Sequence, residues 1–336
     1  MPRKLATIAR IDGVVNHPNA DRLDIVAIRG WKVVTQKGLY QLGDLCVYCE
    51  IDSLMPKDNP EFASFSGCKW KIKTRKIRGE LSQGVCFPLN ILPPESVKEE
   101  GADVTDALGV KLADAEIPLH YRQNTRPEDM IDFPHEIPKT DEERIQNLDK
   151  DLLDDLEKGK RPLYATEKLD GTSCTYYLDE NGEFHVCSRN KELLDQTKSR
   201  YWEFANEHYV QHQLELLGVP VAVQGELCGP KINRNNYKLD KTRFYVFSIY
   251  FPEDSRYATY AEVQDICNVL SFDIVPHVCY IEKGNGMTRE KALEMADGPS
   301  ILNDKAAREG LVFRSVWGDR NRISFKVISN VYLQLK

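Results

Sequence analysis

Residues 165–172 read Ala165-Thr166-Glu167-Lys168-Leu169-Asp170-Gly171-Thr172, and the rest of the 336-residue chain is best interpreted outward from them. A lysine followed at the second position by aspartate and at the third by glycine can be a covalent nucleophile beside a metal ion. Free lysine titrates near about 10.4, so attack on phosphorus requires a site that lowers its pKa by about 2 to 3 units. Burial or a neighbouring cation would do so. Asp170 would help to hold the metal, and Gly171 would allow a close turn.

Four later segments have the composition of strands and carry a charge or a ring at a defined position. Val221–Gly229 places Glu226 between glycines, where a ligand can approach the backbone. Phe244–Tyr250 is aromatic and β-branched, and Phe247 could offer its ring face to a base. The other two segments are 309–314 and 322–328. Charges beside apolar strands are rarely buried without a partner or a function. These segments therefore favour a chemical role for the lysine motif over an ordinary surface turn.

The ordered set resembles the covalent nucleotidyltransferase superfamily of ATP-dependent ligases and capping enzymes. Its signature is the lysine motif, a glutamate strand, an aromatic strand, a Glu-Gly strand and a terminal lysine strand. Segment 133–148 and Cys187-Ser188-Arg189-Asn190 are similar to the RNA ligases of that superfamily. The resemblance runs from Pro134 to the C-terminus. It implies an ATP-grasp-like nucleotidyltransferase domain of antiparallel sheets and helices, in a chain of the α+β class.

The resemblance also implies a role for each matching residue. Lys168 would take AMP from ATP as a lysyl phosphoramidate, and Lys326 would neutralise the α-phosphate. Mg²⁺ or Mn²⁺ would be held by Asp170 and Glu309, with Glu226 as a further candidate. The expected nucleotide-binding residues are Glu167, Lys168, Gly171, Arg189, Glu226, Phe247, Glu309 and Lys326, with Arg144 as a weaker candidate.

Within that set, Arg189 and Glu226 would contact the ribose and Phe247 would stack on adenine. One position departs from the family pattern. Family members often carry two lysines in the last strand, and the first of those positions is Ser324 here. Lys326 is therefore expected to act as the main cation of that strand.

Composition sets the broad class. The chain is 41% hydrophobic and 29% charged, as expected for an ordinary globular protein, and its length favours two domains. It has no apolar run of about 18 residues and no apolar signal core, which predicts no membrane association. Nine scattered cysteines indicate reduced thiols, so a cytoplasmic or nuclear location is expected, with an organelle left open. We expect a monomer.

The region up to about residue 127 has short strands with turn residues between them, a pattern typical of a small β-barrel. The expected strands are 5–15, 23–28, 31–35, 45–51 and 70–77. Segments 17–23 and 76–85 are similar to OB-fold tRNA-binding modules, and OB barrels bind single strands through basic grooves. The segment after Lys326 is too short to form the C-terminal OB domain of DNA ligases and capping enzymes. The accessory domain is therefore expected at the N-terminus, and this architecture resembles the fifth RNA ligase family.

A net charge of −7 is unfavourable for an RNA-binding protein, so the distribution of charge matters. An alternating strand over residues 69–75 would place four cations on one side, with apolar residues opposite. The cations of this basic stripe are Lys69, Lys71, Lys73 and Arg75. They are expected to bind RNA, although lysines that protect an edge strand would give the same pattern.

The segment between the domains is predicted to be helical. Thr140-Asp141-Glu142-Glu143 has the pattern of a capping box, and apolar residues recur at helical spacing until Gly159. Arg144 would lie in the first turn, where a cation does not suit the helix dipole, which suggests a use on ATP phosphates. The expected domains are an OB fold at 1–127, a helical linker at 128–160 and an adenylyltransferase domain at 161–336.

These features predict an ATP-dependent RNA ligase that seals 3′-hydroxyl and 5′-phosphate RNA ends through lysyl-AMP and an RNA adenylate. A DNA ligase and a GTP-dependent capping guanylyltransferase share the same chemistry and remain alternatives. A non-catalytic RNA-binding protein on a ligase fold is a third. The preferred RNA substrate and the pathway served do not follow from the sequence.

Overall fold

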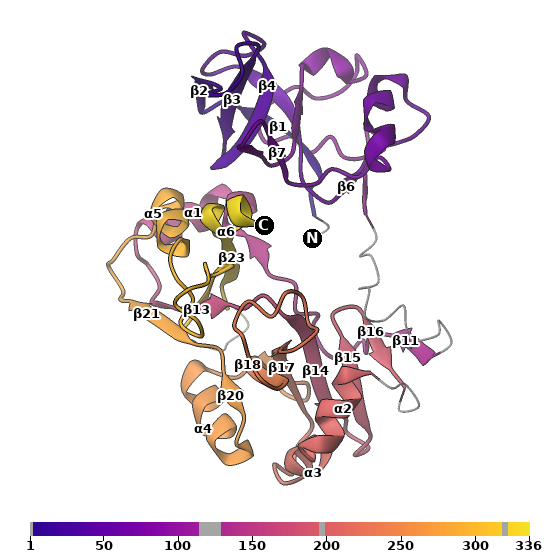
Figure 1. Ribbon diagram of the computed structural model, residues 1–336, viewed down its shortest axis with the longest axis vertical. Coiled ribbons are helices and arrows are strands. Elements are labelled where there is room, and N and C mark those ends of the chain that lie inside the picture. The colour runs from indigo at the N-terminus through magenta and orange to yellow at the C-terminus, as the bar shows by residue number, and fades with distance from the viewer. Residues whose placement is uncertain (1–2, 114–128, 195–198, 318–321) are drawn as a thin grey trace. The chain divides into compact units, whose positions relative to one another are not determined.

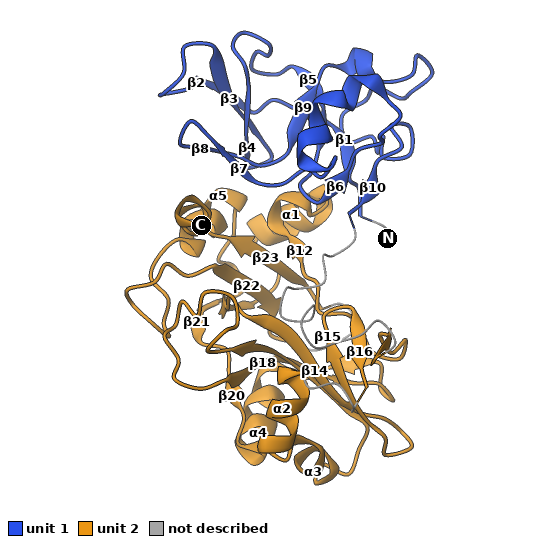
Figure 2. Cartoon of the chain, turned by 45° about the vertical axis from the view of Figure 1, so that its right-hand side comes forward, with its two compact units in different colours: residues 1–116 blue, residues 117–336 orange. Residues whose placement is uncertain are grey.

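The computed structural model describes residues 3–113, 129–194, 199–317 and 322–336. The chain divides into two compact units, residues 1–116 and 117–336 (Figure 2). The sequence had placed this division near residue 127, which lies outside the described residues.

Unit 1 is built from short antiparallel strands. In the order of the chain they are β1 (Ala6–Arg10), β2 (Gly13–Asn16), β3 (Leu23–Ile28), β4 (Trp31–Gln36), β5 (Leu45–Cys49), β6 (Ser53–Leu54), β7 (Arg75–Ile77), β8 (Glu80–Ser82), β9 (Val85–Phe87) and β10 (Lys111–Leu112). They pair as β1-β5-β9, β2-β3-β4, β7-β8 and β10-β6. These are separate sheets, so the described residues of this unit do not form the closed barrel that the sequence had predicted.

Most of the expected strands of unit 1 are confirmed, because alternating apolar residues bury one face. In β4, Trp31, Val33 and Thr35 are buried while Lys32 and Gln36 are exposed. The strand expected over residues 5–15 is two strands, β1 and β2, and the one over 45–51 ends at Cys49. The described part of this unit, residues 3–113, also contains the 3-10 helices η1 (Pro60–Cys68) and η2 (Leu89–Ile91).

The strand predicted through the basic stripe is wrong over most of its length. Lys69 is the left-handed C-cap of η1 with φ 55°, and its backbone N–H donates to the carbonyl groups of Phe65 and Ser66. Trp70 is also left-handed, with φ 56°, and only Arg75–Ile77 form a strand. Because a left-handed residue breaks the two-residue period, the four cations do not share one strand face.

Unit 2 contains two sheets and the helices that cover them (Figure 1). The eight-stranded sheet has the order β11-β16-β15-β14-β17-β18-β19, and β20 also pairs with β18. Its strands are β11 (Met130–Asp132), β14 (Thr172–Leu178), β15 (Phe184–Ser188), β16 (Lys191–Leu193), β17 (Val221–Cys228), β18 (Arg243–Phe251), β19 (Arg256–Tyr257) and β20 (Asp273–Ile274).

The five-stranded sheet has the order β12-β23-β22-β13-β21. Its strands are β12 (Glu143–Arg144), β13 (Leu163–Lys168), β21 (His277–Ile281), β22 (Gly310–Ser315) and β23 (Ser324–Ile328). All pairs in the two sheets are antiparallel except β12 with β23 and β18 with β20. The strands expected for the lysine, glutamate, aromatic, Glu-Gly and terminal lysine motifs are therefore all present.

Each sheet buries one face beneath helices, and the strands' other faces carry the motif side chains. The helices of unit 2 are η4 (Ile145–Asn147), α1 (Lys150–Glu157), α2 (Arg200–Glu207), α3 (Val210–Glu215), α4 (Tyr260–Leu270), α5 (Arg289–Ala296) and α6 (Asn330–Leu335). Helices α2, α3 and α4 share a core with the eight-stranded sheet, and α1 and α5 share one with the five-stranded sheet. In β13, Ala165 joins this core while Lys168 is on the opposite face.

The predicted capping box at 140–143 is wrong. Helix α1 begins at Lys150, and its N-cap is Asp149, whose side chain accepts from the Leu152 N–H. The preceding segment is extended instead, because β12 pairs in parallel with β23. Arg144 is therefore in a strand and not in the first turn of a helix, which removes the dipole argument for its role.

A hairpin with an Asn-Gly turn follows the lysine motif. Strands β14 and β15 pair antiparallel, with Leu178 opposite Phe184. The turn between them is Asp179-Glu180-Asn181-Gly182, and Gly182 has φ 78°, a conformation that glycine adopts without strain.

All nine cysteines are free thiols, in agreement with the reduced state predicted from their number and spacing. Among the described residues, no helix combines the length and the apolar character needed to cross a membrane.

Candidate active site

The lysine motif and the Glu-Gly motif meet because β13 and β22 are neighbours. Lys168 lies opposite Gly310 in this pairing. Its Nζ atom is 2.9 Å from Oε2 of Glu309, the residue just before β22, and the two side chains are 25% and 16% exposed. Gly310 is required at this crossing, because a Cβ there would come within 2.0 Å of the Val327 carbonyl oxygen. The two motifs thus bring an amine and a carboxylate into direct contact.

Three surrounding carboxylates determine the charge state of Lys168. Burial lowers its pKa, but the carboxylates of Glu309, Glu226 and Asp170 outweigh burial and raise the pKa above its ordinary value. Attack on phosphorus requires a lower pKa, and these three carboxylates from distant segments oppose that unless a cation offsets their charge. Without a bound cation, the site holds the amine protonated.

Glu226 lies on β17 and reaches the turn that follows Lys168. Its Oε1 atom accepts a hydrogen bond of 3.1 Å from the backbone N–H of Gly171. Burial raises the pKa of Glu226 to about 8, with Lys168 opposing and Glu309 adding to the rise. Gly171 permits this contact, because a Cβ there would lie 2.3 Å from the Leu227 carbonyl oxygen.

Asp170 is held by residues that the motif analysis did not single out. Its Oδ1 accepts from Asn233 at 2.8 Å, and its Oδ2 accepts from Asn236 at 2.9 Å and from the Tyr332 hydroxyl at 2.6 Å. Its backbone N–H donates to the Tyr237 hydroxyl at 2.6 Å. Tyr332 is in α6, beyond the last motif, so its contact with residue 170 has no local sequence signal. The carboxylate is thus oriented from two sides.

We expect the Tyr332→Phe variant to loosen this arrangement. It removes one of the three side-chain donors to a buried carboxylate, which should cost about 1 to 3 kcal/mol in the free energy of unfolding. Urea denaturation would measure that loss. Tyr280→Phe, at a side chain that is 56% exposed, is the matched control. Equal stability of the two variants would show that the hydroxyl does not support Asp170.

Glu167 is buried on the opposite face of β13. Its Oε2 accepts from the backbone N–H of Ile301 at 2.7 Å, and burial raises its pKa. The predicted role in nucleotide binding is not evident in these contacts, which tie Glu167 to the segment after α5. Its backbone N–H also donates to the Pro276 carbonyl group.

Phe247 lies on β18 and remains partly exposed, as a base-stacking ring would need to be. The guanidinium of Arg314 lies 5.6 Å from its ring centroid. Arg314 is itself only 2% exposed, donates to Thr166 at 3.1 Å and pairs with Glu142 at 3.3 Å. Neither Glu142 nor Arg314 was predicted to belong to the site.

The two cations expected at the phosphate and the ribose share one carboxylate. Lys326 Nζ lies 2.8 Å from Asp141 Oδ1, and an Arg189 terminal nitrogen lies 2.6 Å from the same oxygen. The β14–β15 hairpin therefore brings Arg189 to the same carboxylate as Lys326. Ser324, where the sequence departs from the pattern expected for the family, pairs with Arg314 across β22 and β23. Arg144 pairs with Lys326 in the backbone register.

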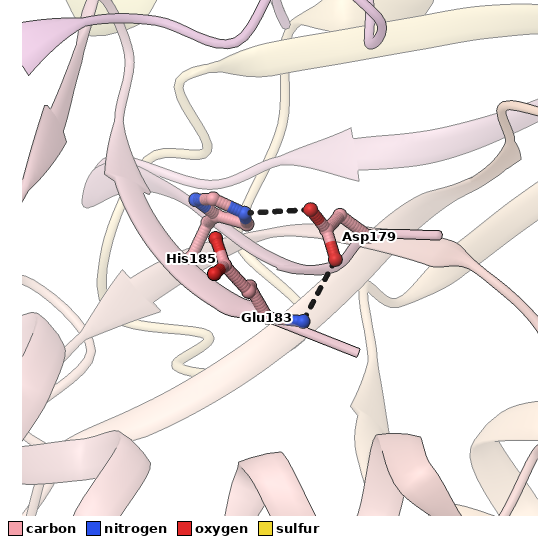
Figure 3. A group of neighbouring side chains, drawn as sticks. All are labelled: Asp179, Glu183 and His185. Carbon is pink, nitrogen blue, oxygen red and sulfur yellow. Dashed lines mark hydrogen bonds and ion pairs between the residues drawn. The ribbon is translucent and has the colours of Figure 1, made fainter. Parts of the chain in front are cut away.

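One further group of side chains has the composition of a metal site. Asp179, Glu183 and His185 place ligand atoms within 4.8 Å of one another in the β14–β15 hairpin (Figure 3). Local contacts explain the group. Asp179 accepts from the backbone N–H groups of Asn181 and Glu183, as expected for a turn aspartate, and His185 Nδ1 lies 2.7 Å from Glu192.

The His185 pair predicts a pH dependence of stability. The hydrogen bond to Glu192 raises the pKa of His185 above its ordinary value of 6.5, against the effect of burial. The stabilisation is therefore fully present below about pH 6.5 and is lost as the pH rises through the folded-state pKa. We expect the urea midpoint difference between wild type and His185→Gln to be larger at pH 5.5 than at pH 8.5. An equal difference at both values would contradict this.

Comparison with known proteins gives the class. A model described as RNA ligase matches residues 161–328, and one described as an OB-fold domain matches residues 5–89. No curated protein matches the chain.

Solved structures extend the match to the full chain. An RNA ligase of Naegleria gruberi, solved with PPi, is 33% identical, covers 99% of each chain and has a TM-score of 0.82. A lysine-to-alanine variant of that ligase with ATP and Mn has 32% identity, 99% coverage of each chain and a TM-score of 0.83. A glutamate-to-alanine variant of the same ligase with AMP and Mn has 33% identity, 99% coverage of each chain and a TM-score of 0.84.

The fold defines a nucleotidyltransferase domain of the RNA ligase type. The chain belongs to the family of ATP-dependent RNA ligases, with an N-terminal OB-fold domain. The predicted class of enzyme is thereby confirmed.

Proposed function

We propose that the protein joins a 3′-hydroxyl RNA end to a 5′-phosphate RNA end in three steps. Lys168 Nζ attacks the α-phosphorus of ATP, so that an N–P bond forms and pyrophosphate leaves. A 5′-phosphate oxygen then attacks the same phosphorus and releases the lysine. Finally the 3′-hydroxyl attacks the 5′-phosphate, and AMP leaves. The contact between Lys168 and Glu309, within a ring of carboxylates, is the observation that carries this proposal.

The nucleotide would lie across the free faces of the two sheets. Phe247 would stack on adenine, Arg189 and Glu226 would contact the ribose, and Lys326 would meet the α-phosphate. The further nucleotide contacts that we propose are Gly171, Arg144 and the backbone of Glu167, because the Glu167 side chain is buried on the opposite face of β13. The backbone register supports this placement. Val312 of β22 lies opposite Thr166 of β13, two positions before Lys168, and it also lies opposite Lys326 of β23. Lys168 and Lys326 are therefore on the two strands that flank β22.

The donor set also fits a divalent cation. Glu226 and Glu309 bring carboxylate oxygens to the same amine, and oxygen ligands are those that Mg²⁺ and Mn²⁺ prefer. Burial raises the pKa of Glu226 and Glu309 adds to the rise, so a nearby cation would favour the ionised form of this carboxylate. When bound, the metal would neutralise charge on the α-phosphate. Asp170 stays a proposed ligand, and the Naegleria structures with ATP and Mn support the pairing of nucleotide and metal.

The protein's own residues then control the proton on the nucleophile. Glu309 can accept the proton that Lys168 must lose, because the two groups are already in hydrogen-bond contact. The negative charge of the surrounding carboxylates raises the pKa of Lys168. A bound cation that offsets this charge would therefore lower the free-energy cost of deprotonating the amine.

Unit 1 would bind the polynucleotide, as OB folds commonly do. Lys69, Lys73 and Arg75 are exposed and Lys71 is half-buried beside Asp52, at 3.7 Å, so they remain candidates without forming a strand stripe. We propose that the protein works as a monomer.

A nick-sealing panel tests the RNA assignment against the DNA ligase and capping alternatives. Nicked duplexes with RNA or DNA on each side of the nick would be compared by gel electrophoresis. Sealing that requires RNA at the nick supports the proposal, and equal sealing of all-DNA nicks would contradict it. Absence of sealing with every substrate would favour a non-catalytic RNA-binding protein.

A further inference from the structure

A short extended segment, residues 138–144, ties the two sheets of unit 2 together. At one end, the Pro138 carbonyl group accepts from Gln224 of β17 at 2.7 Å. Thr140 and Ser173 of β14 then share a hydrogen bond of 2.6 Å. At the other end, β12 pairs with β23 of the five-stranded sheet. We call residues 138–144 the strap.

Asp141, in the middle of the strap, contacts a cation from each sheet. Its Oδ1 atom accepts from Lys326 of β23 and from Arg189, which directly follows β15. Both cations belong to the proposed nucleotide site, and neither sheet alone could set their separation. One oxygen atom therefore fixes the spacing between them.

We propose that Asp141 is a positioning residue that holds Lys326 and Arg189 in place for the phosphate and the ribose of ATP. The inference rests on the proposed function and adds a residue to it. Lys326 has three N–H donors and Arg189 has five, so each retains donors for the nucleotide while it binds Asp141. The bridge is therefore compatible with a bound nucleotide.

The electrostatics support the same role. Burial lowers the pKa of Lys326, and Arg144 and Lys168 lower it further, while Asp141 opposes them. Burial raises the pKa of Asp141, but Lys326 and Arg189 outweigh it and hold the pKa well below its usual range. Asp141 is thus ionised at neutral pH and helps to keep Lys326 charged although that side chain is only 16% exposed.

The test is ATP binding measured by calorimetry in a Lys168→Met background, where the covalent step cannot occur. Asp141→Asn keeps the shape and removes the charge, so we expect about ten- to a hundredfold weaker binding, the loss associated with charged hydrogen bonds. The difference should grow as the pH is raised, since Lys326 then loses its proton more readily. Asp141→Glu should restore part of the affinity.

Glu143→Gln is the matched control on the same strap. The Glu143 carboxylate accepts from the Arg144 backbone N–H at 2.8 Å and from Asn147 at 3.1 Å. The Glu143→Gln variant should leave ATP affinity unchanged. Unchanged or tighter binding by Asp141→Asn would overturn the inference. So would an equal loss at all pH values together with a lowered melting temperature. Because binding is measured without the covalent step, this result is separate from whether the wild-type protein forms lysyl-AMP.

Discussion

Arginine in place of Lys168 should lower the rate of enzyme–AMP formation by at least about a thousandfold. The guanidinium stays protonated at any accessible pH and has no lone pair with which to attack phosphorus. Arginine nevertheless keeps the positive charge beside Glu309, so the surrounding carboxylates remain compensated. Transfer of label from α-labelled ATP to the protein, resolved by denaturing electrophoresis, would measure the loss.

RNA that already carries a 5′-adenylate separates a lost nucleophile from a damaged site. The last step needs no lysine amine, so Lys168→Arg should still seal this substrate at a rate within about tenfold of wild type. Label retained on the arginine variant, or loss of both activities together, would contradict the role assigned to Lys168.

Glu309→Gln should have the second largest effect, a loss of about a hundredfold or more in enzyme–AMP formation. Glutamine keeps the shape of the side chain but removes the charge that contacts the Lys168 amine and that could help bind a cation. We also expect the variant to require more Mg²⁺ or Mn²⁺ for half-maximal rate. Titration of either metal at saturating ATP would show this.

Glu294→Gln, at an exposed glutamate of α5, is the control for the loss of one negative charge. It should match wild type in rate and in metal requirement. Glu309→Gln with a wild-type rate and an unchanged metal requirement would show that the Glu309 carboxylate has no part in the reaction.

Local patterns predicted the elements that carry the site. The Asn-Gly turn at 181–182 fixes the β14–β15 hairpin, because only a few residues decide its geometry. Strand β3 is Leu23–Ile28, as predicted, because it is rich in apolar and β-branched residues. The order of the five motifs was likewise sufficient to indicate the family.

Contacts between distant segments were not predictable in the same way. Asp170 meets Tyr332, 162 residues away, and Lys326 meets Asp141 across 185 residues. Segment 140–143 has the pattern of a capping box, but Asp141 pairs with cations and β12 pairs with β23, so tertiary contacts outweigh the local preference. The carboxylates around Lys168 were not predictable for the same reason, since Glu226 and Glu309 come from other strands.

The most direct test of the account is to incubate the wild-type protein with α-labelled ATP or GTP and Mg²⁺, digest it, and identify the labelled peptide. The account predicts label from ATP alone, on the peptide that contains Lys168. Label from GTP, label on a different residue, or no label with either nucleotide would contradict it.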